Sequence, residues 1–205
     1  MVEHTTHERI AVIGAGAWGT TLANLLAAKG YQVKLWVREP ALAEHIARDR
    51  INTPYLPEFP IHANVTPTPD LATAAQNTRL FISVVPSHAV RTIWQTLGPL
   101  VPSKALITSA TKGIEAESLL TMSQVLHTII PTEKQVDIAL LSGPSFAREV
   151  SQNIPTAVVA AATDRAIAET VQQLFSTSVF RVYTNTDVLG IELGGALKNV
   201  MAIAA

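Results

Sequence analysis

Residues 10–30 read IAVIGAGAWGTTLANLLAAKG, and this stretch decides the fold. The apolar run Ile10–Ile13 predicts a buried strand that stops at a glycine. Apolar residues at helical spacing follow over Trp18–Lys29, and Gly30 is placed to end that helix. A buried strand, a glycine turn and a helix in this order are typical of the first βαβ unit of a parallel sheet.

The turn itself, residues 14–19, reads GAGAWG and matches the pattern GxGxxG. In such a turn Gly14 permits the tight bend, Gly16 lets the backbone approach a pyrophosphate, and Gly19 lets helix and strand pack closely. The free amides and the positive end of the helix attract phosphates. An ordinary glycine-rich turn is the alternative, but the strand before it and the helix after it favour a dinucleotide site.

The alternation of strands and helices continues along the chain. We expect further strands at Gln32–Val37, Leu80–Val85, Ala105–Ser109, Asp137–Leu141, Thr156–Ala162 and Phe180–Tyr183. We expect helices at Pro40–Arg48, Ser87–Leu97 (Ser87 as N-cap), Ser118–Ile129 and Ala166–Phe175, and a proline-rich loop at Asn52–Pro60. Strands separated by helices predict an α/β fold with a Rossmann-like, doubly wound, mostly parallel sheet.

Composition excludes several classes of function. Apolar residues make up 48% of the 205 residues and charged residues 15%, as in a globular protein with a buried sheet. The net charge of −1 gives no attraction to nucleic acid or an anionic membrane. There is no cysteine, the histidines lack metal-binding spacing, and no apolar run is long enough for a bilayer. We therefore expect a cytoplasmic protein with no metal site and no membrane span.

The last residues predict a second structural unit. From Asp187 onward apolar residues keep helical spacing up to Ala205, and no cap or polar tail closes the pattern. We expect residues 1–186 to form the nucleotide-binding domain and 187–205 to form the first helix of a truncated, helical substrate domain. The alternative is a short helix that packs on the sheet.

The end of the second strand reads Val37-Arg38-Glu39, about twenty residues beyond the last glycine, where nucleotide specificity is set. Arg38 offers a planar cation for the 2′-phosphate of NADP. Glu39 can contact the ribose instead, so NAD stays open as a second cofactor. A solvated surface charge is the alternative for Arg38.

Two lysines stand where chemistry is expected. Lys112 follows a predicted strand at the sheet edge where open α/β sheets bind ligands. Lys198 lies on an apolar helix in which Gly194, Gly195 and Ala196 permit close packing, so we expect its amine to be shielded from bulk water. A lysine that reaches the surface along its apolar stem is the alternative.

The segments IGAGAWGTTLA, VVPSHA, ATKGIE, SGPSFA and LGGALKNVMAIAA resemble the bacterial type of NAD(P)-dependent glycerol-3-phosphate dehydrogenase, in the same order over essentially the whole chain. That family continues with a helical C-terminal domain. The resemblance implies interconversion of sn-glycerol 3-phosphate and dihydroxyacetone phosphate, which supplies glycerol phosphate for phospholipid synthesis.

The resemblance also assigns roles to individual residues. It implies NADPH contacts by Ala17, Trp18, Arg38 and Ala147, in addition to the glycines of the turn. It implies substrate contacts by Gly143 and Ser145, a junction of cofactor and substrate at Lys112, and a proton acceptor at Lys198.

Two other functions stay open. One is a different two-domain dehydrogenase of the 3-hydroxyacid or 6-phosphogluconate kind, which also uses a helical lysine. In those enzymes an asparagine follows the lysine four residues later, whereas Asn199 follows Lys198 directly. The other is a non-catalytic NADP-binding module, which needs the glycine turn but not both lysines. The sequence does not decide whether the chain forms a homodimer.

Overall fold

The computed structural model describes the backbone of residues 9–204 and the side chains of 9–198 and 203–204. The strands are β1 (Arg9–Ile13), β2 (Gln32–Trp36), β3 (Ile51–Asn52), β4 (Leu56–Pro60), β5 (Val65–Thr68), β6 (Leu80–Ser83), β7 (Leu106–Ser109), β8 (Asp137–Ser142), β9 (Thr156–Ala161) and β10 (Phe180–Asn185). The helices are α1 (Ala17–Ala28), α2 (Pro40–Asp49), α3 (Leu71–Ala75), α4 (Ser87–Leu97), α5 (Met122–Ile129), α6 (Ala147–Ser151), α7 (Arg165–Phe175) and α8 (Val188–Ala204), with short 3-10 turns at Gly98–Leu100 and Thr132–Lys134.

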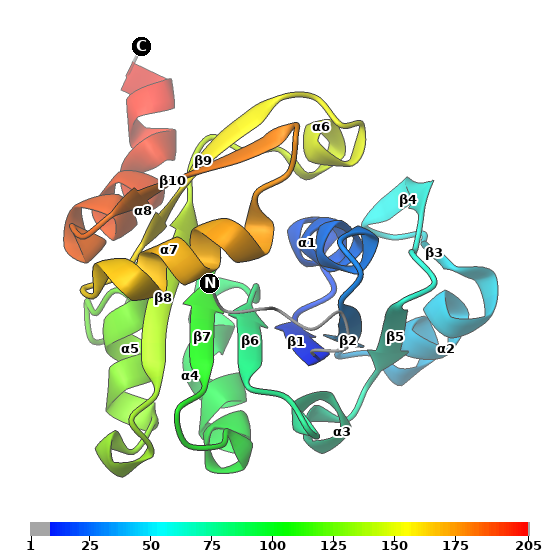
Figure 1. The fold of residues 1–205 in the computed structure, drawn as a ribbon, viewed down its shortest axis with the longest axis horizontal. Coiled ribbons are helices and arrows are strands. Elements are labelled where there is room, and N and C mark those ends of the chain that lie inside the picture. The colour runs from blue at the N-terminus through cyan, green and yellow to red at the C-terminus, as the bar shows by residue number, and fades with distance from the viewer. Residues whose placement is uncertain (1–8, 205) are drawn as a thin grey trace.

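Eight strands form one sheet in the order β10-β9-β8-β7-β6-β1-β2-β5 (Figure 1). Every neighbouring pair is parallel except β8 and β9, which run antiparallel. The predicted doubly wound, mostly parallel sheet is therefore confirmed. The parallel strands β1, β2, β6 and β7 place their carboxyl ends at one edge, where loops of such sheets bind ligands.

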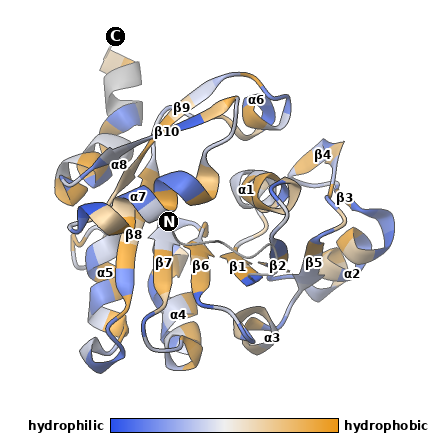
Figure 2. Ribbon diagram, viewed as in Figure 1, coloured by the Kyte–Doolittle hydropathy of each residue, from blue (hydrophilic) through white to orange (hydrophobic). Residues whose placement is uncertain are grey.

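Helices cover both faces of the sheet, and successive residues of β1 show why. Ile10 and Val12 pack into a core with α1, α2 and α7, whereas Ala11 and Ile13 pack into a second core with α3, α4 and α5. A strand that is buried on both faces needs a continuous apolar run. Figure 2 shows this as hydrophobic colour along the central strands.

The expected loop at Asn52–Pro60 was wrong. Residues in this stretch form the antiparallel hairpin β3–β4, in which Ile51 pairs with Pro60 and Asn52 with Leu56. Prolines are tolerated there because a two-stranded hairpin has free edges at which no amide is needed. The short elements β5 and α3 were also not predicted from the sequence.

One helix start and one helix cap also differ from expectation. α5 begins at Met122 rather than Ser118, because Thr121 and Gln124 form a capping box. Leu119, with φ 59°, lies in the left-handed region and cannot continue a helix. Pro86 rather than Ser87 caps α4.

None of the helices in the described part of the chain has the length and apolar composition needed to cross a bilayer. Among the same residues, no three acidic or histidine side chains are grouped to hold a metal ion.

Candidate functional site

The glycine turn after β1 has the geometry expected of each glycine. Gly14 has φ 120°, a conformation that favours glycine. A Cβ built on Gly19 would lie 1.9 Å from the carbonyl oxygen of Gly14, so helix and strand meet through backbone alone. Apart from its chain neighbours, no described residue has an atom within 4 Å of a Cβ built on Gly16. The turn is therefore closed at Gly14 and Gly19 and open at Gly16.

The open side of the turn faces a pocket of about 490 Å³ at the carboxyl edge of the sheet. This volume is typical of a small-molecule or cofactor site. The pocket brings together most of the predicted site residues, namely Gly14, Gly16, Ala17, Trp18, Gly19, Arg38, Lys112 and Ser145. Residues of the β6–α4 connection, Val84–Ser87, form another part of its wall.

Arg38 and Glu39 lie at the end of β2, at one side of the pocket. The Nε and Nη2 atoms of Arg38 both donate to the Oε1 atom of Glu39, at 2.8 and 2.5 Å. The Arg38 side chain is largely exposed and that of Glu39 about half-exposed. A bound nucleotide would thus meet a guanidinium that is partly occupied and a carboxylate beside it, which suits either a 2′-phosphate or a ribose hydroxyl.

Trp18 lies in the first turn of α1 and lines the pocket. Its ring packs against Phe180, with the centroids 6.3 Å apart and the planes tilted by 43°. The indole Nε1 is buried, and no described residue accepts its hydrogen bond. The indole ring therefore packs against Phe180, and the indole N–H has no acceptor among the described residues.

Lys112 joins the β7 edge to the SGPSFA segment. Its Nζ donates to the carbonyl oxygen of Gly143 at 2.8 Å. Gly143 has φ 150°, and a Cβ there would lie 2.9 Å from the Cα of Val158. Burial, and then the positive charge of Lys198, lower the pKa of Lys112. The half-buried Lys112 amine is thus held in place beside a second cation.

Lys198 is exposed, so the expectation of a shielded amine was wrong for the described chain. Its Nζ lies 5.7 Å from the ring centroid of Phe146, and that ring is itself 62% exposed. The reason is the course of α8, which runs away from the sheet toward the C-terminus (Figure 1). Leu197 and Lys198 on this helix are consequently exposed to solvent.

The beginning of α8 is nevertheless held against α5 and against β8. The carboxylate of Glu192 accepts hydrogen bonds from the backbone amide and the hydroxyl of Ser123, at 2.8 and 2.6 Å, in the first turn of α5. A Cβ on Gly195 would lie 2.8 Å from the Ser142 hydroxyl, so the expected close approach is confirmed there. Gly194 faces open space, and the same expectation was wrong for it.

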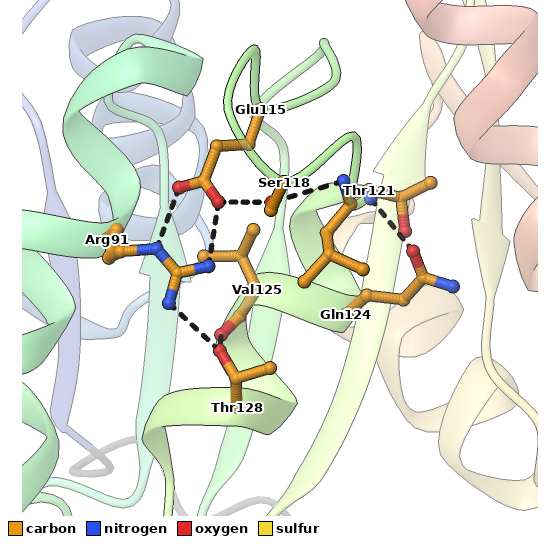
Figure 3. A network of polar contacts seen from close by, with 8 residues as sticks. Arg91, Glu115, Ser118, Thr121, Gln124, Val125 and Thr128 are labelled. Carbon is orange, nitrogen blue, oxygen red and sulfur yellow. Dashed lines mark hydrogen bonds and ion pairs between the residues drawn. The ribbon is translucent and has the colours of Figure 1, made fainter.

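The loop that carries Lys112 is held by a polar network that sequence reasoning missed (Figure 3). Arg91 on α4 donates from Nε and Nη2 to the two carboxylate oxygens of Glu115, at 2.9 and 2.7 Å, and from Nη1 to Thr128 at 3.2 Å. Ser118 donates to Glu115 as well. The hydrogen bonds from Arg91, followed by that from Ser118, lower the pKa of Glu115. No pattern in a single sequence reveals a contact between side chains 24 positions apart.

The SGPSFA segment reaches α1 through Ala147. The hydroxyl of Thr21 donates to the Ala147 carbonyl oxygen at 3.2 Å. Ala147 begins α6, so Pro144 lies before that helix. Gly143, Ala147 and Lys198 lie outside the lining that the described residues give the pocket, although Gly143 contacts it through Lys112.

Asn52 on β3 is the second contact that the sequence did not reveal. Its Nδ2 donates to the carbonyl oxygen of Ala15 and to the hydroxyl of Thr20, both at 2.8 Å. The side chain is fully buried. Because Asn52 fell in a predicted loop, only its position in the folded hairpin identifies it.

A sequence model of the "NAD-dependent glycerol-3-phosphate dehydrogenase N-terminus" matches residues 9–168. The chain belongs to this dehydrogenase family. It is 51% identical over 198 residues to a glycerol-3-phosphate dehydrogenase [NAD(P)+] of Geobacter sp. (strain M21), a match that covers 97% of this chain and 59% of the relative. It is 47% identical over 198 residues to the enzyme of that name from Moorella thermoacetica, covering 96% and 58%.

Solved structures of glycerol-3-phosphate dehydrogenases share the fold. That of Coxiella burnetii superposes with a TM-score of 0.90 at 36% identity and covers 98% of this chain and 60% of its own. A 3-hydroxyisobutyrate dehydrogenase of Mycobacterium tuberculosis has a TM-score of 0.71 at 12% identity, which shows a common fold alone. The chain spans about 59% of the length of the curated relatives it matches.

Proposed function

We propose that this member of the glycerol-3-phosphate dehydrogenase family carries the nucleotide site and the reacting amines of an enzyme that interconverts sn-glycerol 3-phosphate and dihydroxyacetone phosphate. One observation carries the proposal: a single pocket joins the glycine turn, Arg38 and Lys112. The names of the relatives support the choice of substrate.

The cofactor proposed for the pocket is NADPH, with NADH as a second choice. The amides at the start of α1 would hold the pyrophosphate, since a helix N-terminus attracts phosphate. Arg38 would hold the 2′-phosphate of NADPH, and Glu39 a ribose hydroxyl of NADH. The proposed cofactor contacts are Gly14, Gly16, Ala17, Trp18, Gly19, Arg38, Lys112 and Ala147.

The proposed substrate contacts are Lys112 and Ser145, which line the pocket, and Gly143 and Lys198, which lie outside its lining. Lys112 and Lys198 are cations close enough for the charge of one to lower the pKa of the other, so together they attract an anionic substrate. Ser145 lines the pocket and offers a hydroxyl to a substrate oxygen.

The nicotinamide supplies the exchange of a hydride with C2 of the substrate. The protein must then move one proton at the C2 oxygen. In the oxidative direction the neutral amine of Lys198 accepts that proton as the hydride leaves, and in reduction the ammonium returns it. The positive charge of Lys112 would hold the C2 oxygen while the proton moves.

We further propose that residues 187–205 belong to a helical substrate domain packed against residues 1–186. A domain that packs over Leu197 and Lys198 of α8 would shield the Lys198 amine, which is exposed in the described chain. We also propose a cytoplasmic enzyme that supplies glycerol phosphate for phospholipid synthesis. A homodimer is the oligomer to test first.

The assay is NADPH oxidation with dihydroxyacetone phosphate, followed by absorbance, on this chain and on the chain extended to the full length of its relatives. We expect turnover in the extended protein that depends on both substrates. Absence of turnover in an extended, folded protein that binds NADPH would overturn the proposed reaction.

A non-catalytic NADP-binding module is the second candidate, because the nucleotide pocket is assembled while Lys198 is exposed. The same assay separates the two, since a module of this kind binds NADPH without turnover at either length. The third candidate, a dehydrogenase of the 3-hydroxyacid type, is tested by assay with NADP and a 3-hydroxyacid such as 3-hydroxyisobutyrate.

A further inference from the structure

We infer that Asn52 is a positioning residue that orients the glycine turn toward the pyrophosphate of the nucleotide. The inference rests on the proposed nucleotide site but not on the proposed reaction. Asn52 lies 37 residues beyond Ala15 in the sequence, on a hairpin outside the main sheet. It lies outside the pocket lining, so its effect must pass through the turn.

The contacts of Asn52 use its whole donor capacity. The amide nitrogen donates one hydrogen to the Ala15 carbonyl and the other to the Thr20 hydroxyl, both at 2.8 Å. A primary amide has two hydrogens, so both are satisfied. The Thr20 hydroxyl lies 3.5 Å from the same Ala15 carbonyl. The Ala15 carbonyl is therefore the shared acceptor of a small buried cluster.

The direction of the Ala15 carbonyl sets the direction of the next amide. The peptide unit between Ala15 and Gly16 is planar and trans, so its carbonyl and its N–H point in opposite directions. Asn52 draws the carbonyl into the buried cluster, and the Gly16 N–H must then point to the other side. That side is the open one, because Gly16 lines the pocket and has no neighbour within 4 Å of a built Cβ apart from its chain neighbours.

The chemistry of Asn52 points to orientation rather than to filling of space. The Oδ1 atom is buried, and no described residue donates to it. A buried, unpaired acceptor is costly, and an apolar side chain would fill the same volume without that cost. What the amide adds is its pair of donors, which bind Ala15 in the glycine turn and Thr20 directly after it.

The test compares a ligand that contains the pyrophosphate with one that lacks it. NADPH and adenosine 2′-monophosphate are titrated against wild type and Asn52→Asp, which keeps the shape of the side chain but loses both donors. We expect the Kd for NADPH to rise by about 10-fold or more, and the Kd for adenosine 2′-monophosphate to change by less than about 2-fold. Thr20→Val, which removes one partner of the cluster, should give a smaller loss of the same kind.

A matched control comes from Asn24 on α1, which holds the other end of the same hairpin. Its Nδ2 donates to Pro60 at 2.9 Å, and its Oδ1 accepts from the His62 amide at 3.0 Å. Asn24→Asp loses a donor to the hairpin without touching the turn. We expect it to leave the affinity for NADPH unchanged.

The outcomes are distinct. Unchanged NADPH affinity in folded Asn52→Asp and Thr20→Val overturns the inference, and so does an equal loss for both ligands, which would mark a structural role. If Asn52→Asp does not fold, the Thr20→Val ratio decides alone. A folded wild type that binds no NADPH overturns the proposed nucleotide site itself.

Discussion

The two ends of the proposed site are built differently: the nucleotide end is the glycine turn of residues 14–19, and the amine end is Lys112 with Lys198. At the nucleotide end, backbone groups and glycines determine the geometry, and a buried asparagine on a neighbouring hairpin holds the turn. At the amine end, the geometry depends on long side chains, of which Lys112 has one hydrogen bond and Lys198 is exposed. The comparison teaches that short-range backbone packing fixes the proposed nucleotide end within this chain, whereas the proposed proton-transfer group lies exposed on a helix.

The largest expected effect separates the two ends by function. Lys198→Met in a protein that turns over should lower kcat by about 10²–10⁴-fold, because a positioned proton donor is lost. The Kd for NADPH should stay within about 2-fold, since Lys198 lies outside the pocket lining of the described residues. Single-turnover kinetics and an NADPH titration measure the two quantities.

The control for Lys198 is Lys104→Met. Lys104 is exposed and lies just before β7, at the opposite edge of the sheet from the pocket. Equal kcat for Lys198→Met and this control would remove Lys198 from the proton transfer.

Gly19→Ala should break the nucleotide end. Its Cβ would lie 1.9 Å from the Gly14 carbonyl oxygen, and backbone cannot move aside cheaply. Overpacking of this kind costs about 1–3 kcal/mol. We expect a fall of that size in the free energy of unfolding, and a loss of NADPH affinity of at least about 10-fold.

Gly194→Ala is the matched change at the amine end. Gly194 is a helical glycine in open space, so alanine should stabilise α8 slightly. Denaturant unfolding and an NADPH titration on both variants check the pair. Normal NADPH binding by Gly19→Ala would contradict the role of close backbone packing.

Breaking the Arg91–Glu115 ion pair should loosen the loop that carries Lys112 without changing Lys112 itself. Hydrogen bonds, chiefly from Arg91, lower the pKa of Glu115, so its stabilising effect is full above the ordinary carboxyl pKa and is lost as pH falls through the lowered value. Glu115→Gln should therefore lower Tm at neutral pH and lose this effect in acid. A Tm difference that does not shrink in acid would contradict the assignment.

Glu39→Gln should shift nucleotide choice by a smaller amount. The change frees the Arg38 guanidinium for a 2′-phosphate and removes an acceptor for a ribose hydroxyl. Because the pair is exposed, we expect the ratio of NADPH to NADH affinity to rise by only about 2–5-fold. Glu44→Gln, a change at an exposed carboxylate on α2, should leave the ratio unchanged. An unchanged ratio in Glu39→Gln would sink the idea that Glu39 competes for Arg38.

The smallest effect concerns the pKa of Lys112. Burial is the larger cause of its lowered pKa and the charge of Lys198 the lesser one, so Lys198→Met should raise that pKa only partly toward an ordinary lysine. The free energy of unfolding rises with pH between the lowered pKa and the ordinary one, because the unfolded chain binds more protons there. NMR titration of the Lys112 side chain measures the shift, and no change in Lys198→Met would show that the amines do not interact.

Local patterns account for what the sequence predicted. The buried strand, the turn and α1 lie within twenty residues, so periodicity and glycine spacing were sufficient to place Gly14, Gly16 and Gly19. The alternation of strands and helices likewise predicted the parallel sheet. Lys112 was placed at the pocket because a residue that follows a parallel strand must lie at the carboxyl edge.

Contacts between distant residues account for what it missed. Asn52 acts at Ala15 and Arg91 at Glu115, and neither pair leaves a periodic signal. The start of α5 depends on a capping box whose residues also fit a longer helix. The exposure of Lys198 follows from the direction of α8, which small residues in its sequence do not specify.

The most direct test is a titration of this chain with NADPH, followed by the fluorescence of its tryptophans, with a melting curve to confirm folding. A nucleotide end that is complete in these residues predicts saturable quenching, a higher Tm with ligand, and weaker binding in Gly19→Ala. A well-folded chain with no saturable response to NADPH would contradict the account.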